Sequence, residues 1–130
     1  MRVTLALFIA AAALSSPPAA AEPPDIHVDV PNGAKGLEVY VRQRDIAAGE
    51  KVGWHIHHGT EIAYVLSGAV NVQIGGGPIR HLVKGDTFEV ERDVPHRAYN
   101  DGTETASLLI TYLKDKAGPL AIPVAGPAVR

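Results

Sequence analysis

Hydrophobic and polar residues alternate along much of the chain after Gly36, with the two-residue period of a β-strand. The segment Leu37–Arg42 predicts a strand that buries Leu37, Val39 and Val41 on one face. Ile62–Leu66 is a nearly continuous apolar run, which predicts a strand buried on both faces. Further strands are predicted at Val70–Ile74, Ile79–Val83, Thr87–Val90, His96–Tyr99 and Thr105–Leu113.

Turn signals separate these strands about every 8–12 residues, a spacing typical of β-sandwiches and β-barrels. The run Gly75–Pro78 predicts a turn that joins the strands on either side of it into a hairpin. No window keeps a helical period with caps at both ends. The pattern therefore indicates an all-β protein.

The N-terminal segment has the features of a signal peptide. Arg2 supplies a positive charge, Val3–Leu14 is mostly apolar, and small residues end at Ala21. The apolar run is shorter than the roughly 20 residues of a membrane anchor. We expect cleavage after Ala21 and a periplasmic or secreted protein with no membrane attachment; an uncleaved hydrophobic N-terminus is the alternative.

Proline and glycine mark the borders of the predicted domain. Residues 22–36 are expected to form an irregular N-terminal arm, and residues 37–114 the β-barrel domain. Residues 115–130 form a tail in which Pro119, Pro123 and Pro127 prevent a helix or a central strand. This tail is expected either to lie extended on the barrel or a neighbouring subunit, or to be frayed.

Composition narrows the classes of function. A chain of 130 residues fits one domain. Its 12 basic and 14 acidic residues leave no basic patch that would indicate nucleic acid as the partner. Because cysteine is absent, disulfides, thiolate metal ligands and a cysteine nucleophile are excluded.

Three histidines and a glutamate have the spacing of a candidate metal site. His55 and His57 are two residues apart and would project from one face of a strand. Glu61 follows a predicted turn at Gly59–Thr60, which would bring its carboxylate opposite the two imidazoles. His96 begins a distant strand and could supply a third imidazole. Burying Glu61 without a cation or strong hydrogen bonds would cost several kcal/mol, so the pattern favours a metal site over ordinary strand histidines.

The spacing around these residues resembles the two motifs of the cupin family. The first motif matches Gly49, His55, His57, Glu61 and Gly68 at every fixed position. The second matches three positions with the correct gaps and departs at two, where the family usually has proline and glycine. The matching positions are Gly85, His96 and Asn100, and the departures are Glu91 and Asp93. The departures leave the conformation of the turn before His96 open.

The resemblance implies a single-domain jelly-roll barrel with His55, His57, Glu61 and His96 as ligands of one divalent transition metal. Three imidazoles and a carboxylate suit Mn, Fe, Co, Ni, Cu or Zn. The resemblance further implies a dioxygenase, isomerase, decarboxylase or lyase acting on a small chelating molecule, with no evident general base. A non-catalytic metal- or metabolite-binding module and a closed structural zinc site remain alternatives, and a homodimer is possible.

Several other residues have two interpretations each. Arg42 and Arg44 could bind an anionic substrate, but their alternation fits a solvated strand face better. His58 could carry protons or support a ligand, or it could be a solvated turn residue. Trp54 is expected to pack away from the metal. The remaining expectations are Asn100 as a hydrogen-bond brace, Asp86 as a turn cap, Tyr64, Tyr99 and Tyr112 in a cavity or interface, and His27 and His81 on the surface.

Overall fold

The computed structural model describes residues 25–30, 34 and 36–128. The predicted signal peptide, residues 1–21, lies outside the described residues. Every regular element in the described part is a β-strand, and no helix there is long and apolar enough to cross a membrane. The strands are β1 (Ile26–Asp29), β2 (Leu37–Ile46), β3 (Lys51–Ile56), β4 (Gly59–Ser67), β5 (Ala69–Ile74), β6 (Ile79–Val83), β7 (Thr87–Val90), β8 (His96–Tyr99), β9 (Ala106–Asp115) and β10 (Ile122–Pro123).

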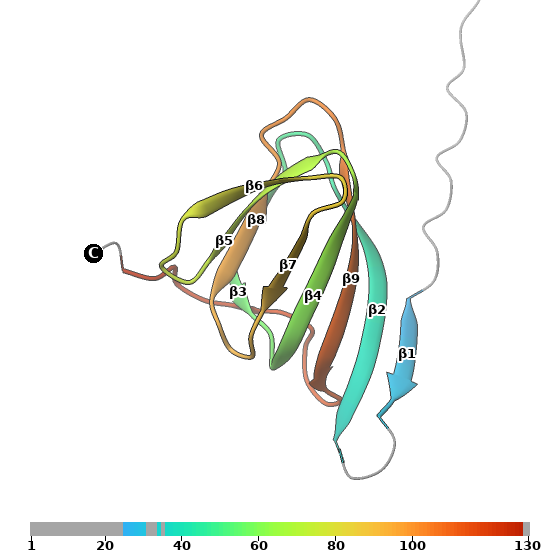
Figure 1. The fold of residues 1–130 in the computed structure, drawn as a ribbon. Helices are drawn as coiled ribbons and strands as arrows, with labels where there is room; N and C mark the ends of the chain where they lie inside the picture. The colour runs from blue at the N-terminus through green and yellow to red at the C-terminus, as the bar shows by residue number, and fades with distance from the viewer. Residues whose placement is uncertain (1–24, 31–33, 35, 129–130) are drawn as a thin grey trace, which may run out of the picture.

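The strands form two five-stranded antiparallel sheets (Figure 1). One sheet has the order β1-β2-β9-β4-β7 and the other the order β10-β3-β8-β5-β6. From β2 to β10, successive strands alternate between the two sheets except at the hairpin of β5 and β6, which lie in one sheet. This arrangement is a jelly roll, which confirms the predicted all-β fold class.

The core lies between the two inner faces and is made mostly of branched aliphatic side chains. Alternate positions of β4, β5 and β9 point inward, as the period of two requires. Some of these side chains, such as Val72 and Leu108, also line the cavity described below. The largest fully buried side chains are Val65, Val70, Val72, Val90 and Leu108.

Strand β2 is turned over relative to the prediction. Tyr40 and Ile46 belong to the buried core, and Arg42 and Arg44 line an internal cavity. The residues predicted to be buried, including Val39, therefore lie on the outer face. The prediction was wrong because it assumed that the more apolar face of the strand is buried, whereas the interior of this barrel also accommodates polar side chains.

The run Ile62–Leu66 is not buried on both faces, as was predicted. It belongs to β4, in which Ala63 and Val65 are buried while Ile62 and Tyr64 are 54% and 44% exposed. The outer face of this sheet is apolar, which gives the run its continuous hydrophobic character. Hydrophobicity alone does not distinguish such a face from a buried one.

Both ends of the described chain add a strand to the barrel. Within the arm predicted to be irregular, Ile26–Asp29 pairs with β2, so that part of the prediction was wrong. In the C-terminal tail, Ile122–Pro123 pairs with β3, and the backbone N–H of Val124 donates to the carbonyl of Trp54. The tail therefore lies on the barrel, one of the two predicted possibilities.

Tight turns connect the strands where the family motifs place glycine. Gly49, Gly68 and Gly85 all have positive φ. At Gly68 a side chain is also excluded by space, since a Cβ would lie 2.5 Å from the carbonyl oxygen of Thr105. Asp86 caps the turn after Gly85 by accepting a hydrogen bond from the N–H of Val83 at 2.9 Å, as predicted.

Candidate metal centre

The four predicted ligands meet inside the barrel. His55 is the second-last residue of β3, and His57 is the first residue after that strand. Glu61 lies on β4, and His96 is the first residue of β8. One potential ligand atom from each residue lies within 4.8 Å of those of the other three. His57, Glu61 and His96 are buried, and His55 is half-buried. The spacing in the sequence therefore brings these side chains together as expected.

Two local features aim these side chains inward. A register shift between Val52 and His55, where β3 pairs with β8, lets both residues face the cavity although they are three positions apart. The chain then reverses at His57–His58, earlier than the predicted turn at Gly59–Thr60. Gly59 already belongs to β4, where the backbone of β9 leaves no room for a side chain.

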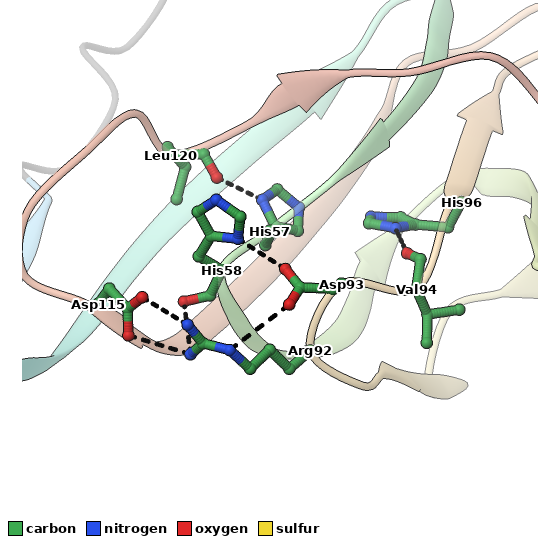
Figure 2. Close-up of polar contacts among 8 residues, drawn as sticks. All are labelled: His57, His58, Arg92, Asp93, Val94, His96, Asp115 and Leu120. Atoms are coloured by element: carbon green, nitrogen blue, oxygen red, sulfur yellow. Dashed lines mark hydrogen bonds and ion pairs between the residues drawn. The ribbon is translucent and has the colours of Figure 1, made fainter.

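Each of the three histidines is oriented by a backbone carbonyl. His55 Nδ1 lies 2.8 Å from the oxygen of Gly53, and His96 Nδ1 lies 3.0 Å from that of Val94. His57 Nδ1 lies 2.5 Å from the oxygen of Leu120 (Figure 2). A carbonyl oxygen only accepts, so each Nδ1 carries the proton. In the neutral rings every Nε2 then presents a lone pair.

These Nε2 atoms surround the carboxylate of Glu61 without a hydrogen bond to it. Oε2 of Glu61 lies 2.8 Å from His57 Nε2 and 3.4 Å from His96 Nε2. The distances suit hydrogen bonds, but the directions do not, and both buried Nε2 atoms lack a hydrogen-bond partner. Lone pairs that converge on an anion repel it unless a cation lies between them.

Burial and charge favour the protonation states of His55 and Glu61 that metal binding needs. Burial lowers the pKa of His55, and the neighbouring imidazoles lower it further, which favours the neutral ring. Burial alone would raise the pKa of Glu61, but His57 and His96, through the hydrogen bonds and positive charge that these rings offer when protonated, lower that pKa to about 2. These shifts favour a neutral His55 and an ionised Glu61, the states in which both residues bind a metal.

This donor set fits a divalent transition metal. Three neutral nitrogen donors and one anionic oxygen donor suit borderline ions from Mn to Zn. The carbonyl that holds each Nδ1 is the kind of partner that metal-bound histidines use to fix their tautomer. The orphaned Nε2 atoms, the fixed rings and the buried carboxylate thus agree with the metal site that the motif implies.

A cavity of about 150 Å³ opens beside the four residues. Its walls are mostly apolar and include Val52, Phe88 and Ile110. A cavity of this size accommodates a molecule as large as benzene. Tyr112 also lines it, and burial together with the charge of Glu61 raises the pKa of the Tyr112 phenol, which stays protonated. The site can therefore take one small molecule.

A polar network fixes the turn before His96 (Figure 2). Asp93 has a φ of 61°, so it adopts the left-handed conformation at the position where the family has glycine. Its carboxylate lies 2.6 Å from His58 Nδ1, and its N–H donates to the carbonyl of His57 at 3.0 Å. Arg92 forms two hydrogen bonds with Asp115 and one with the His58 carbonyl. The departure from the motif thus leaves the turn intact, and His58 is half-buried and paired with Asp93.

Other predicted roles are confirmed outside the cavity. Asn100 is buried and its amide donates to the carbonyls of Ile46 and Glu104, so it is a brace. Trp54 lies outside the cavity, where the guanidinium of Arg97 stacks over it at 5.1 Å. His27 and His81 are exposed, as predicted. Of the three tyrosines expected in a cavity or an interface, Tyr112 lines the cavity, Tyr64 is exposed and Tyr99 is half-buried, so an interface role for the last two stays a prediction.

Two features of the site were missed or misjudged. Arg42 and Arg44 line the cavity, so a solvated strand face was the wrong choice between the two interpretations. Their spacing of two, shared with Tyr40, was the signal that could have placed them inside. Leu120, whose carbonyl orients His57, comes from the tail and gave no signal in the sequence.

A jelly roll with a His-rich cluster in its interior defines a cupin-type protein. The chain belongs to the cupin family, because the family model described as "Cupin domain" matches residues 43–112, more than half of the chain. A search of curated proteins found no match. The family relation supports the metal-binding interpretation of the cluster.

Solved structures show the same fold. A conserved protein with a double-stranded β-helix domain from Klebsiella pneumoniae is 27% identical with a TM-score of 0.54, over 81% of this chain and 89% of that one. An oxalate oxidase in complex with the substrate analogue glycolate is 25% identical with a TM-score of 0.59, over 78% of this chain and 54% of that one. The DMSP lyase DddQ from Ruegeria pomeroyi is 21% identical with a TM-score of 0.59, over 79% and 52%. The chain spans about half the length of the last two.

Proposed function

We propose that this protein is an exported, metal-dependent cupin enzyme, an oxidoreductase or a lyase, that acts on a small chelating organic molecule. One observation carries the proposal. Three histidines, each fixed through Nδ1 by a carbonyl, turn their free Nε2 atoms toward a buried carboxylate at the wall of a cavity. Export rests on the signal-peptide features of residues 1–21.

His55, His57, Glu61 and His96 would hold the metal. When bound there, the ion would supply Lewis-acid or dioxygen chemistry to a substrate that coordinates it. The protein contributes the surroundings. Apolar walls keep water away from the substrate, and Tyr112 offers a protonated hydroxyl within the same cavity. The similarity to an oxalate oxidase supports chemistry on small oxygen-rich molecules.

The test is metal analysis of the protein purified from its own cell envelope without an affinity tag. We expect about one equivalent of a single divalent metal in the wild type and almost none in His57→Ala and His96→Ala variants. The matched control is His81→Ala, which removes an exposed imidazole outside the cluster. Equal metal content in all four proteins, or none in the wild type, would contradict the proposal.

A second measurement separates enzyme from binding module. The metal-loaded protein is incubated with a panel of small hydroxy acids, diketones and catechols, and products are detected by mass spectrometry. Turnover that disappears in His96→Ala supports an enzyme. Tight uptake of a compound with no product would favour a non-catalytic binding module instead.

A further inference from the structure

Two arginines share the cavity with the four candidate ligands. Arg42 and Arg44 lie on β2 and point inward with Tyr40 and Ile46. The rest of the cavity wall is mostly apolar and includes Ile110. Because the whole cavity measures about 150 Å³, one small molecule there would reach both the ligand cluster and the arginines.

The register of the sheet places Arg42 close to Glu61. Glu61 pairs across β9 with Tyr112, and Arg42 pairs with Ile110, one inward position further along the same strand. Two strand spacings and one inward step separate the backbones by roughly 12 Å. Both side chains reach into the same cavity from these positions, so a small molecule in the cavity can contact both of them.

The two arginines differ in what they bind. Arg44 is paired with the carboxylate of Glu50 at the edge of the barrel. Among the described residues no carboxylate forms an ion pair with Arg42; its guanidinium interacts with the hydroxyl of Tyr40, and its buried Nε has no hydrogen-bond partner. An unpaired buried donor on a charged group is costly. Glu61, the acidic residue of the cavity wall, is held by the histidine cluster, so the acceptor for Arg42 is expected to come from a ligand.

We propose that Arg42 is the anion anchor of this cavity, and that the ligand is a short carboxylate. One end of the ligand would occupy the metal site, and a carboxylate oxygen at the other end would accept a hydrogen bond from Arg42. The guanidinium matches a carboxylate in shape and charge. This inference deepens the proposed function and rests on it for the metal-binding end only; the arginine end stands on the cavity itself.

The experiment uses malonate and malonamide, which have the same number of heavy atoms but differ in charge. Each is titrated calorimetrically into the full-length protein, metal-loaded and metal-free, after the metal content has been measured. The variants are Arg42→Gln and Arg42→Lys, with Arg80→Gln as a control that removes an arginine from the exposed strand β6. Thermal unfolding confirms that each variant is folded.

We expect Arg42→Gln to weaken malonate binding by about ten- to a hundredfold while malonamide binding is unchanged. Arg42→Lys should recover part of the loss, and Arg80→Gln should match the wild type. A malonate affinity that Arg42→Gln leaves unchanged, or no malonate binding to either form of the wild type, would overturn the anchor.

The failure of the proposed function gives a different result. If the protein takes up no metal, the titration of the metal-free protein still tests Arg42, because the anchor does not involve the metal. Weaker malonate binding that still depends on Arg42 would then support the anchor without the enzyme. Metal uptake with binding that does not depend on Arg42 would support the metal centre and refute the anchor.

Discussion

Removing the C-terminal tail should weaken metal binding although the tail supplies no ligand. The tail touches the site in two places. The carbonyl of Leu120 accepts the hydrogen bond from His57 Nδ1, and Ile122–Pro123 pairs with the end of β3 that carries His55. A chain that stops after Gly118 loses both contacts. All four predicted ligands remain, so any change in metal affinity reports on their orientation.

The magnitude follows from the lost hydrogen bond. Loss of a partner that orients a metal-bound histidine lowers metal affinity about 10- to 100-fold. That range corresponds to about 1.4–2.8 kcal/mol, comparable with the cost of a buried N–H without an acceptor. Truncation also removes Leu120 and Ala121 from the cavity wall and lets water reach Nδ1. Because water can replace the carbonyl in part, we expect about a tenfold loss.

The assay is competition for zinc between the protein and a chromophoric chelator. The control stops after Pro127, which keeps the pairing of β10 and the contact between Gly126 and the Trp54 ring. This control should bind zinc as tightly as the full chain. Thermal unfolding of the metal-free proteins shows whether the shorter chain is still folded.

Unchanged zinc affinity in a folded chain that stops after Gly118 would refute the reasoning. It would mean that the β3–β4 turn orients His57 by itself. An equal loss in both truncations would also refute it, because the control retains the carbonyl of Leu120. Only a loss specific to the shorter chain agrees with orientation by the tail.

Three further outcomes test the fold around the site. Asp93→Gly should be more stable than Asp93→Ala by about 1 kcal/mol in chemical denaturation, because only glycine adopts the positive φ without strain; equal stabilities would contradict this. Lys114 lowers the pKa of Glu38 through their ion pair, so that pair stabilises the fold above the ordinary pKa of glutamate and is lost as pH falls through the folded value. Melting temperatures of wild type and Glu38→Gln should therefore differ at neutral pH and converge in acid, and a constant difference would count against the pair. Gly59→Ala should lower the free energy of unfolding by about 2 kcal/mol or more, because the new Cβ would meet the backbone of β9. Gly53→Ala has open space for its Cβ and should stay within about 1 kcal/mol of the wild type; similar losses in the two variants would contradict the close approach at Gly59.

Most of the strands and the clustering of the four candidate ligands were predictable because they depend on short spacings. The predicted segments Ile79–Val83, Thr87–Val90 and His96–Tyr99 coincide with β6, β7 and β8. Each is bounded by glycine, proline or acidic turn residues that the sequence displays directly. The pair His55 and His57 follows from the same period of two, which brings both imidazoles to the cavity.

The orientation of β2 could not be predicted from hydrophobicity. Along this strand the outward residues include Val39 and Val41, and the inward residues include Arg42 and Arg44. The interior of this barrel contains polar groups, so the more apolar face of a strand is not always the buried one. The neighbouring strand decides the question, because Arg42 pairs with the buried Ile110 of β9.

The three carbonyls that orient the histidines show where prediction from sequence ends. Gly53 and Val94 each lie two residues before the histidine they hold, so His55 and His96 are oriented by the same local arrangement. His57 has no such neighbour and relies on Leu120, 63 residues further along the chain. Two of the rings are therefore fixed as soon as their strands form, whereas the third is fixed only when the tail has docked. The metal site is complete only in the fully folded chain, and the tail is the part of it that a motif search cannot find.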